Sequence, residues 1–143
     1  MINLKSNILQ DVKSMLDFSS VGDFNADFSA DFSIGKGLPI FINEKPNTTK
    51  CNRFIIINAL DLVRDEEVGS VTININVFQR DKMKGNLNDE IYSIAEKVYL
   101  NFFESVYKNG RWYTSNSIST PEKISDNLHY INVRIEANYT DLN

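Results

Sequence analysis

The segment from residue 23 to residue 34 has the most regular pattern of the chain. It reads DFNADFSADFSI, with polar side chains at odd positions and apolar ones at even positions. Successive side chains of a strand point to opposite faces, so this alternation predicts a strand with one apolar and one acidic face. The four-residue spacing of the phenylalanines also fits a helix. Asp, Asn and Ser disfavour helix interiors, however, and we interpret the segment as a strand.

Two other segments repeat apolar residues at intervals of three and four, which is typical of amphipathic helices. The first helix is expected near residues 3–17, with Leu4, Ile8 and Val12 on its apolar side. The second begins at Asn88, a suitable N-cap, and its stripe continues through Ile91, Ala95, Val98, Phe102 and Val106. Asn109 and Gly110 would end it, because both residues accept the left-handed backbone conformation.

The remaining strands are expected at residues 39–42, 53–60, 71–77, 112–113 and 131–139. Residues 53–60 and 71–77 would form a hairpin around a charged turn at 64–67, and residues 119–127 a loop. The order is then α-β-β-β-β-α-β-β. It predicts one domain over residues 1–143 of the α+β class, in which two main helices pack on one face of a mixed or antiparallel sheet.

The composition adds few constraints. Apolar residues make up 42% of the chain and charged residues 24%, as in ordinary globular proteins. A net charge of -4 argues against a protein that functions by gripping phosphates. Cys51 is the sole cysteine, so no intramolecular disulfide can form, which fits a reducing compartment. No apolar run reaches the length needed to cross a bilayer, and the first residues lack a signal-peptide pattern.

The residues that usually carry chemistry are scarce. His129 is the sole histidine, so one subunit can hold neither a catalytic triad nor a two-histidine metal site. Cys51 has no nearby histidine to activate it. Residues 35–37 lack the full spacing of a phosphate loop, and the calcium-loop-like start at Asp23 has Ile34 where a glutamate is required. We therefore expect the chain to have no catalytic residue and to bind no metal and no cofactor. We also expect that it is not an enzyme.

The order of elements resembles that of the tail terminator, or tail completion, proteins of long-tailed bacteriophages. The resemblance rests on the N-terminal helix, the hairpin between Phe54 and Val77, the helix opening Asn88-Asp89-Glu90-Ile91, and the last strand from Tyr130. It implies a homohexameric ring at the head-proximal end of the tail tube, which stops tube polymerisation and joins tail to head. The implied partners are other copies of the chain, the tail tube protein and a head-side connector.

The same resemblance implies that DNA passes through the ring without specific binding, and that no membrane is involved. The protein would be made in the host cytoplasm and reside in the virion at the head–tail junction. It implies no catalytic residue. Two alternatives stay open: another head–tail connector or tail tube subunit, and a small ligand-binding or enzymatic α+β domain whose site is built from Tyr, Asn and Asp residues. The missing histidine, cysteine and glycine-rich constellations disfavour the second alternative.

Three groups of surface residues follow from these expectations. The subunit interface is expected to include Phe24, Phe28, Phe32 and Trp112, because one small sheet cannot hide so many aromatic residues. The acidic strand face carries Asp23, Asp27 and Asp31, which would repel DNA from a lumen or would simply face outer solvent. The loop with Lys82, Met83 and Lys84 is expected to contact a partner.

Overall fold

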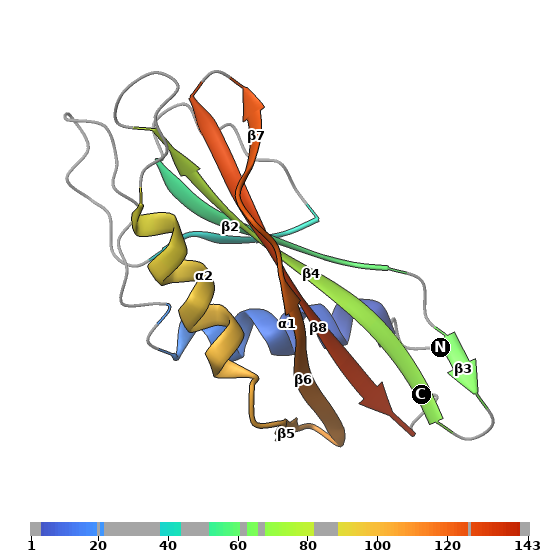
Figure 1. The fold of residues 1–143 in the computed structure, drawn as a ribbon. Coiled ribbons are helices and arrows are strands. Elements are labelled where there is room, and N and C mark those ends of the chain that lie inside the picture. Colours follow the sequence, from blue (N-terminus) through green and yellow to red (C-terminus); the bar gives the residue numbers. More distant parts are fainter. Residues whose placement is uncertain are drawn as a thin grey trace.

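The computed structural model describes residues 4–19, 21, 38–43, 52–60, 63–65, 68–81, 89–125 and 127–140. Within them the chain forms two helices and one mixed sheet (Figure 1). The bounds are α1 Leu4–Asp17, β1 Ile40–Ile42, β2 Arg53–Ala59, β3 Val63–Asp65, β4 Val68–Arg80, α2 Glu90–Asn101, β5 Val106–Lys108, β6 Arg111–Ile118, β7 Glu122–Ser125 and β8 Leu128–Tyr139.

The sheet is built around the long antiparallel pair of β4 and β8, which runs from Gly69↔Tyr139 to Arg80↔Leu128. The strand order is β1-β2-β4-β8-β6-β5, with β3 added beside β4 and β7 beside β8. β1 pairs with β2 in parallel, and the other pairs are antiparallel. The predicted α+β class, with a mixed sheet and two main helices, is confirmed. The expected hairpin of residues 53–60 and 71–77 is confirmed as β2 and β4.

Both helices cover the same face of the sheet. The alternating residues of β4 that point to this face, Val71 to Val77, are at most 1% exposed. They share one core cluster with Ile8 and Val12 of α1 and with Ile91 and Val98 of α2. Figure 1 shows α1 crossing the strands, while α2 runs alongside β8. Burial of these apolar side chains is the main source of stability. The opposite face carries polar residues on β4 and β8 and, beside them, a smaller apolar cluster around Phe54.

The second helix is shorter than the sequence pattern predicts. It ends at Asn101, and Val106, expected as its last apolar contact, lies in β5. Asn109 and Gly110 have φ angles of 52° and 82° and form the turn of the β5–β6 hairpin. The left-handed conformation was expected there, but Asn-Gly between two strand-forming runs is a hairpin signal rather than a helix stop. The carbonyl of Phe102 meanwhile accepts the backbone N–H of Ser115 at 2.9 Å, which holds the end of the helix on β6.

Three smaller expectations need correction. The N-cap of α2 is Asp89, not Asn88. Arg64 and Asp65, expected in a turn, belong to β3, which pairs with the start of β4. The expected loop at residues 119–127 contains β7, because this segment continues along β8 beyond the end of β6.

Several expected features lie outside the described residues. These are the alternating segment at 23–34, Cys51 and most of the loop at 81–87. The same holds for nine candidate residues: Phe24, Phe28, Phe32, Asp23, Asp27, Asp31, Lys82, Met83 and Lys84. Their roles stay predictions.

Candidate functional site

The sheet face opposite the helices carries a row of amide side chains on its two central strands. β4 contributes Asn74 and Asn76, and β8 contributes Asn132 and Arg134. The strand register sets Asn74 opposite Arg134 and Asn76 opposite Asn132. Each of these residues alternates with an apolar residue that points into the core. The pleat of the sheet therefore gathers the four polar side chains on one surface.

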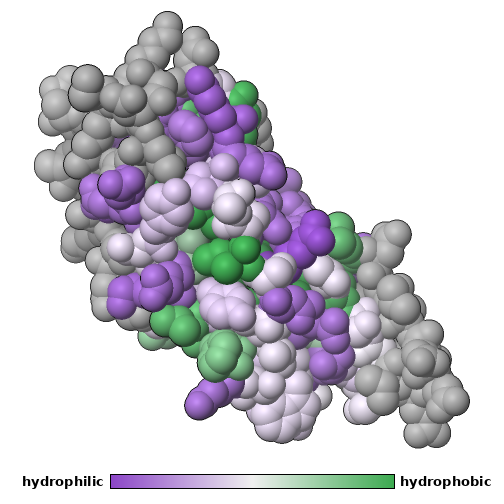
Figure 2. All heavy atoms as spheres, viewed as in Figure 1, coloured by the Kyte–Doolittle hydropathy of each residue, from purple (hydrophilic) through white to green (hydrophobic). Residues whose placement is uncertain are grey.

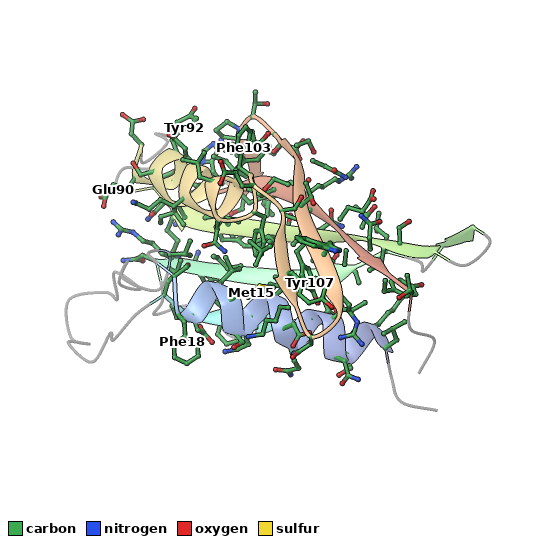
Figure 3. All side chains as sticks on the ribbon, turned by 90° about the horizontal axis from the view of Figure 1, so that it is seen from below. Met15, Phe18, Glu90, Tyr92, Phe103 and Tyr107 are labelled. Carbon is green, nitrogen blue, oxygen red and sulfur yellow. The ribbon has the colours of Figure 1, made fainter. Side chains whose placement is uncertain are left out.

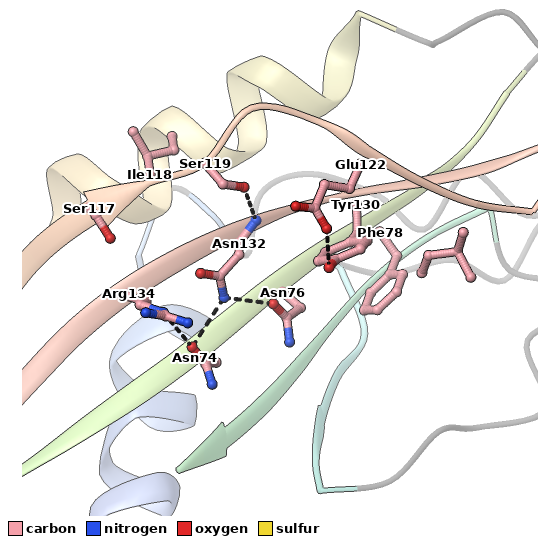
Figure 4. Close-up of a pocket in the computed structure, with 11 residues that line it drawn as sticks. Asn74, Asn76, Phe78, Ser117, Ile118, Ser119, Glu122, Tyr130, Asn132 and Arg134 are labelled. Carbon is pink, nitrogen blue, oxygen red and sulfur yellow. Dashed lines mark hydrogen bonds between the residues drawn. The ribbon is translucent and has the colours of Figure 1, made fainter. Parts of the chain in front are cut away.

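These side chains form one hydrogen-bonded network, shown in Figure 4. Asn132 donates through Nδ2 to Asn76 Oδ1 at 2.8 Å and to Asn74 Oδ1 at 3.2 Å. Arg134 donates through Nε to the same Asn74 oxygen at 3.1 Å. Asn74 in turn donates through Nδ2 to Asn58 Oδ1 on β2 at 3.0 Å. The network fixes the orientation of each amide and of the guanidinium plane.

The network leaves several polar atoms available. Among the described residues, no partner contacts the two terminal nitrogens of Arg134, the Nδ2 of Asn76 or the Oδ1 of Asn132. A guanidinium held through Nε still presents its outer N–H groups in a planar fork, which suits a carboxylate. The amides add one donor and one acceptor beside it.

A groove of about 720 Å³ lies over this network. It forms where β6 ends, after a bulge between Ser115 and Ser117, and where β7 continues beside β8 from Glu122. Ser119 attaches the connection between β6 and β7 to β8, because its Oγ accepts the backbone N–H of Asn132 at 2.9 Å. The lining residues are Asn74, Asn76, Phe78, Ser117, Ile118, Ser119, Glu122, Ile124, Tyr130, Asn132 and Arg134.

The other end of the groove is aromatic and acidic. The rings of Phe54, Phe78 and Tyr130 stack in a row across β2, β4 and β8, with centroids 4.7 and 5.5 Å apart. Tyr130 donates its hydroxyl proton to Glu122 on β7. This hydrogen bond raises the pKa of Tyr130 above its ordinary value of 10.0, and burial adds to the rise. The same hydrogen bond fixes the position of the Glu122 side chain at the rim of the groove.

The β5–β6 hairpin carries an exposed aromatic pair. Tyr107 and Trp112 face each other across the hairpin, with ring centroids 4.9 Å apart, and are 59% and 50% exposed. Trp112, an expected interface residue, is thus on the surface and beside another aromatic ring. Figure 3 shows Tyr107 on the hairpin, and Tyr92 and Phe103 at the α2 end of the molecule. In the view of Figure 2, strongly apolar residues form only small patches among polar ones.

One carboxylate anchors this hairpin to α1. Asp11 accepts hydrogen bonds from Asn109 at 2.8 Å, from Tyr113 at 3.2 Å and from Arg111 at 3.3 Å. Burial raises the pKa of Tyr113 above its ordinary value, and the charge of Asp11 adds to the rise while that of Arg111 opposes it. This cluster holds the hairpin in position against α1.

His129, for which the sequence offered no partner, pairs with Asp81. The Nδ1 of His129 lies 2.8 Å from a carboxylate oxygen of Asp81, whose side chain is fully buried. On the helix-covered side, Arg53 contacts Gln79 at 2.8 Å and also pairs with Glu90. Within the described ranges, no three His, Cys, Asp or Glu side chains gather as metal ligands, and neither helix has the length and apolarity to cross a membrane.

Comparisons with known proteins reach as far as the fold. No family model matches the chain, and no curated protein matches it. A solved structure known by a sequence identifier alone is similar, with a TM-score of 0.56 and 12% identity. The match covers 94% of this chain and 97% of that one. At this identity the likeness shows a shared α+β fold.

The groove was not foreseen from the sequence, although part of its signal is visible there. The run Ile73-Asn74-Ile75-Asn76-Val77 already predicts amides on one strand face. Asn132 and Arg134 occupy the corresponding positions of the last strand. What the sequence does not contain is the register, which brings the two rows together.

Proposed function

We propose that this chain is a structural virion protein that forms a ring at the head-proximal end of a bacteriophage tail tube. In that position it ends tube polymerisation and joins the tail to the head. The proposal rests on the resemblance of element order to tail terminator proteins. The α+β fold, with both helices on one sheet face, is consistent with it.

The observation that carries the ring is the exposed pair of Tyr107 and Trp112 on an edge hairpin. A closed ring needs head-to-tail contacts between two different patches of one subunit. Among the described strands, β5 is at one edge of the sheet and β1 at the other, so the two edges are different surfaces. Aromatic residues are enriched at interface centres, and Trp112 is half exposed in the single chain. We infer that this hairpin packs on the neighbouring subunit.

The first experiment measures the mass of the purified protein by light scattering and native mass spectrometry. We expect a species of six times the 16.4 kDa chain mass. Trp112→Ala should shift this species to the monomer and leave thermal unfolding of the monomer cooperative. Tyr92→Ala is the matched control, because Tyr92 is 47% exposed but lies on α2. A wild-type monomer at every concentration, or full rings of the Trp112 variant, would contradict the proposal.

The second experiment addresses the role in the tail. The ring would be added to polymerising tail tube protein encoded in the same genome, and tube length would be measured by electron microscopy. We expect tubes that stop growing and carry a ring at one end. Rings that leave tube growth unchanged would show that the chain has another place in the particle.

A further inference from the structure

We propose that the groove over Asn74, Asn132 and Arg134 binds an extended peptide segment of a partner protein, with an acidic side chain and a basic side chain four residues apart. The inference goes beyond ring formation and does not depend on it. Its basis is the order of groups along the groove, where the cation of Arg134 and the amide of Asn132 on β8 are followed by the carboxylate of Glu122 on β7.

The polar groups along the groove are spaced like alternate residues of a strand. Arg134, Asn132 and Tyr130 are alternate residues of β8, and Glu122 pairs with Tyr130. A strand rises about 3.3 Å per residue, so Arg134 and the Glu122 position are about 13 Å apart along β8. An extended peptide projects alternate side chains to one side with the same repeat. Its residues i, i+2 and i+4 would meet the arginine, the amides and the glutamate in turn.

The free polar atoms define which side chains fit. The outer nitrogens of Arg134 suit a carboxylate, and the unpartnered Glu122 oxygen, among the described residues, suits an ammonium group. Asn132 Oδ1 and Asn76 Nδ2, which no other described residue contacts, suit an amide or hydroxyl between them. Ile118 and Ile124 are 44% and 49% exposed and give the peptide backbone an apolar wall.

Preorganisation distinguishes this groove from a random polar surface. Arg134 is oriented through Asn74, and Glu122 is oriented through Tyr130. Side chains that are already held lose less conformational freedom when a ligand binds. A second copy of the same face is a poorer occupant, because two concave surfaces placed face to face leave their shared volume unfilled.

The test is fluorescence anisotropy with a labelled peptide, Glu-Thr-Asn-Thr-Lys, with blocked ends. We expect saturable binding that weakens as salt is added. A neutral peptide, Gln-Thr-Asn-Thr-Gln, and a peptide with its charges three residues apart should bind about tenfold more weakly or not at all. The three-residue spacing is the sharper control, because it places the two charges on opposite sides of the extended chain.

Reversing the two charges at the ends of the groove gives the decisive comparison. Arg134→Glu and Glu122→Lys should each weaken binding about tenfold. The double variant should return to within about twofold of the wild type, because the peptide can lie in the reversed direction. Lys123→Glu is the matched control, since Lys123 neighbours Glu122 on β7 but does not line the groove. The milder Arg134→Gln and Glu122→Gln replace the reversals if those disturb folding.

Three outcomes would overturn the proposal. The first is a neutral peptide that binds as tightly as the charged one. The second is a double variant that binds as weakly as either single reversal. The third is no saturable binding of the charged peptide up to about 1 mM. None of these results depends on the mass of the assembled protein, so the ring proposal stands or fails separately.

Discussion

The two faces of the central strand pair share one backbone, but one face is covered by helices, while the other carries polar side chains and, at one end, the rings of Phe78 and Tyr130. Val71 to Val77 and Ile131 to Ile135 point toward α1 and α2 and are almost completely buried. The alternate residues of the same strands, Asn74, Asn76 and Asn132, form the amide network on the other face. A face that only needed solvation would be served by charged residues without mutual contacts. The hydrogen-bonded amides with atoms left over are the basis of the peptide-binding proposal.

The difference also concerns how each face gains stability. The covered face gains it from apolar burial, which is non-directional and large. The amide face gains it from hydrogen bonds, which are individually small because water competes for the same groups. Substitutions on the covered face should therefore affect folding, and those on the amide face should mainly affect binding.

The largest expected effect is on the covered face. Ile75→Ala should lower the free energy of unfolding by about 3 kcal/mol, because Ile75 is fully buried and its removal leaves a cavity. Ile118→Ala, on the groove side, should change it by less than about 0.5 kcal/mol. Urea unfolding followed by circular dichroism measures both. Equal losses would mean that the two faces do not differ as described.

A second effect concerns the attachment of the hairpin. Asp11→Ala should cost about 2 kcal/mol, because it leaves Tyr113 and Arg111, which are both buried, without their shared acceptor. Asp17→Ala removes an exposed pair with Lys13 on the same helix and should cost less than about 0.5 kcal/mol. If the Asp11 variant still forms rings, the hairpin keeps its position despite the lost stability. If the variant is folded but forms no rings, ring assembly depends on the position of the hairpin.

A third and smaller effect separates stability from binding on the amide face. Asn74→Ala removes the shared acceptor of Asn132 and Arg134 and should lower the free energy of unfolding by about 1 kcal/mol. Binding of the charged peptide should fall about fivefold, since Arg134 loses its orientation. Lys123→Ala, on β7 but outside the groove lining, is the control. A stability loss as large as that of Ile75→Ala would show that the network is structural.

The sequence predicted the covered face far better than the site. Alternation in residues 71–77 and 131–139, and the helical stripe from Ile91 to Val98, follow directly from burial and were correctly interpreted. The end of α2 was missed because Phe102 and Val106 continue the helical spacing, although Asn109-Gly110 is a hairpin turn. The groove was missed because it depends on strand register and on the bulge at Ser115, which no local pattern encodes.

The smallest effect uses two tyrosines that both donate to carboxylates, one on each face. Tyr113 is fully buried beside Asp11, and Tyr130 contacts Glu122 at the groove. The pKa of each is raised in the folded protein, so the folded state holds the phenol proton more tightly than the unfolded state does. The resulting stability is present below the ordinary value of 10.0 and is lost as pH rises above it.

Burial is the first cause of the pKa shift at Tyr113. We therefore expect Tyr113 to contribute more than Tyr130 to the fall of the unfolding free energy at alkaline pH. Tyr113→Phe should flatten the fall of the unfolding free energy above pH 10, and Tyr130→Phe should change it little. Denaturant unfolding at a series of alkaline pH values, with the phenolate absorbance recorded in parallel, measures this. A larger flattening in the Tyr130 variant would mean that the hydrogen bond to Glu122 raises the pKa of Tyr130 more than burial raises that of Tyr113.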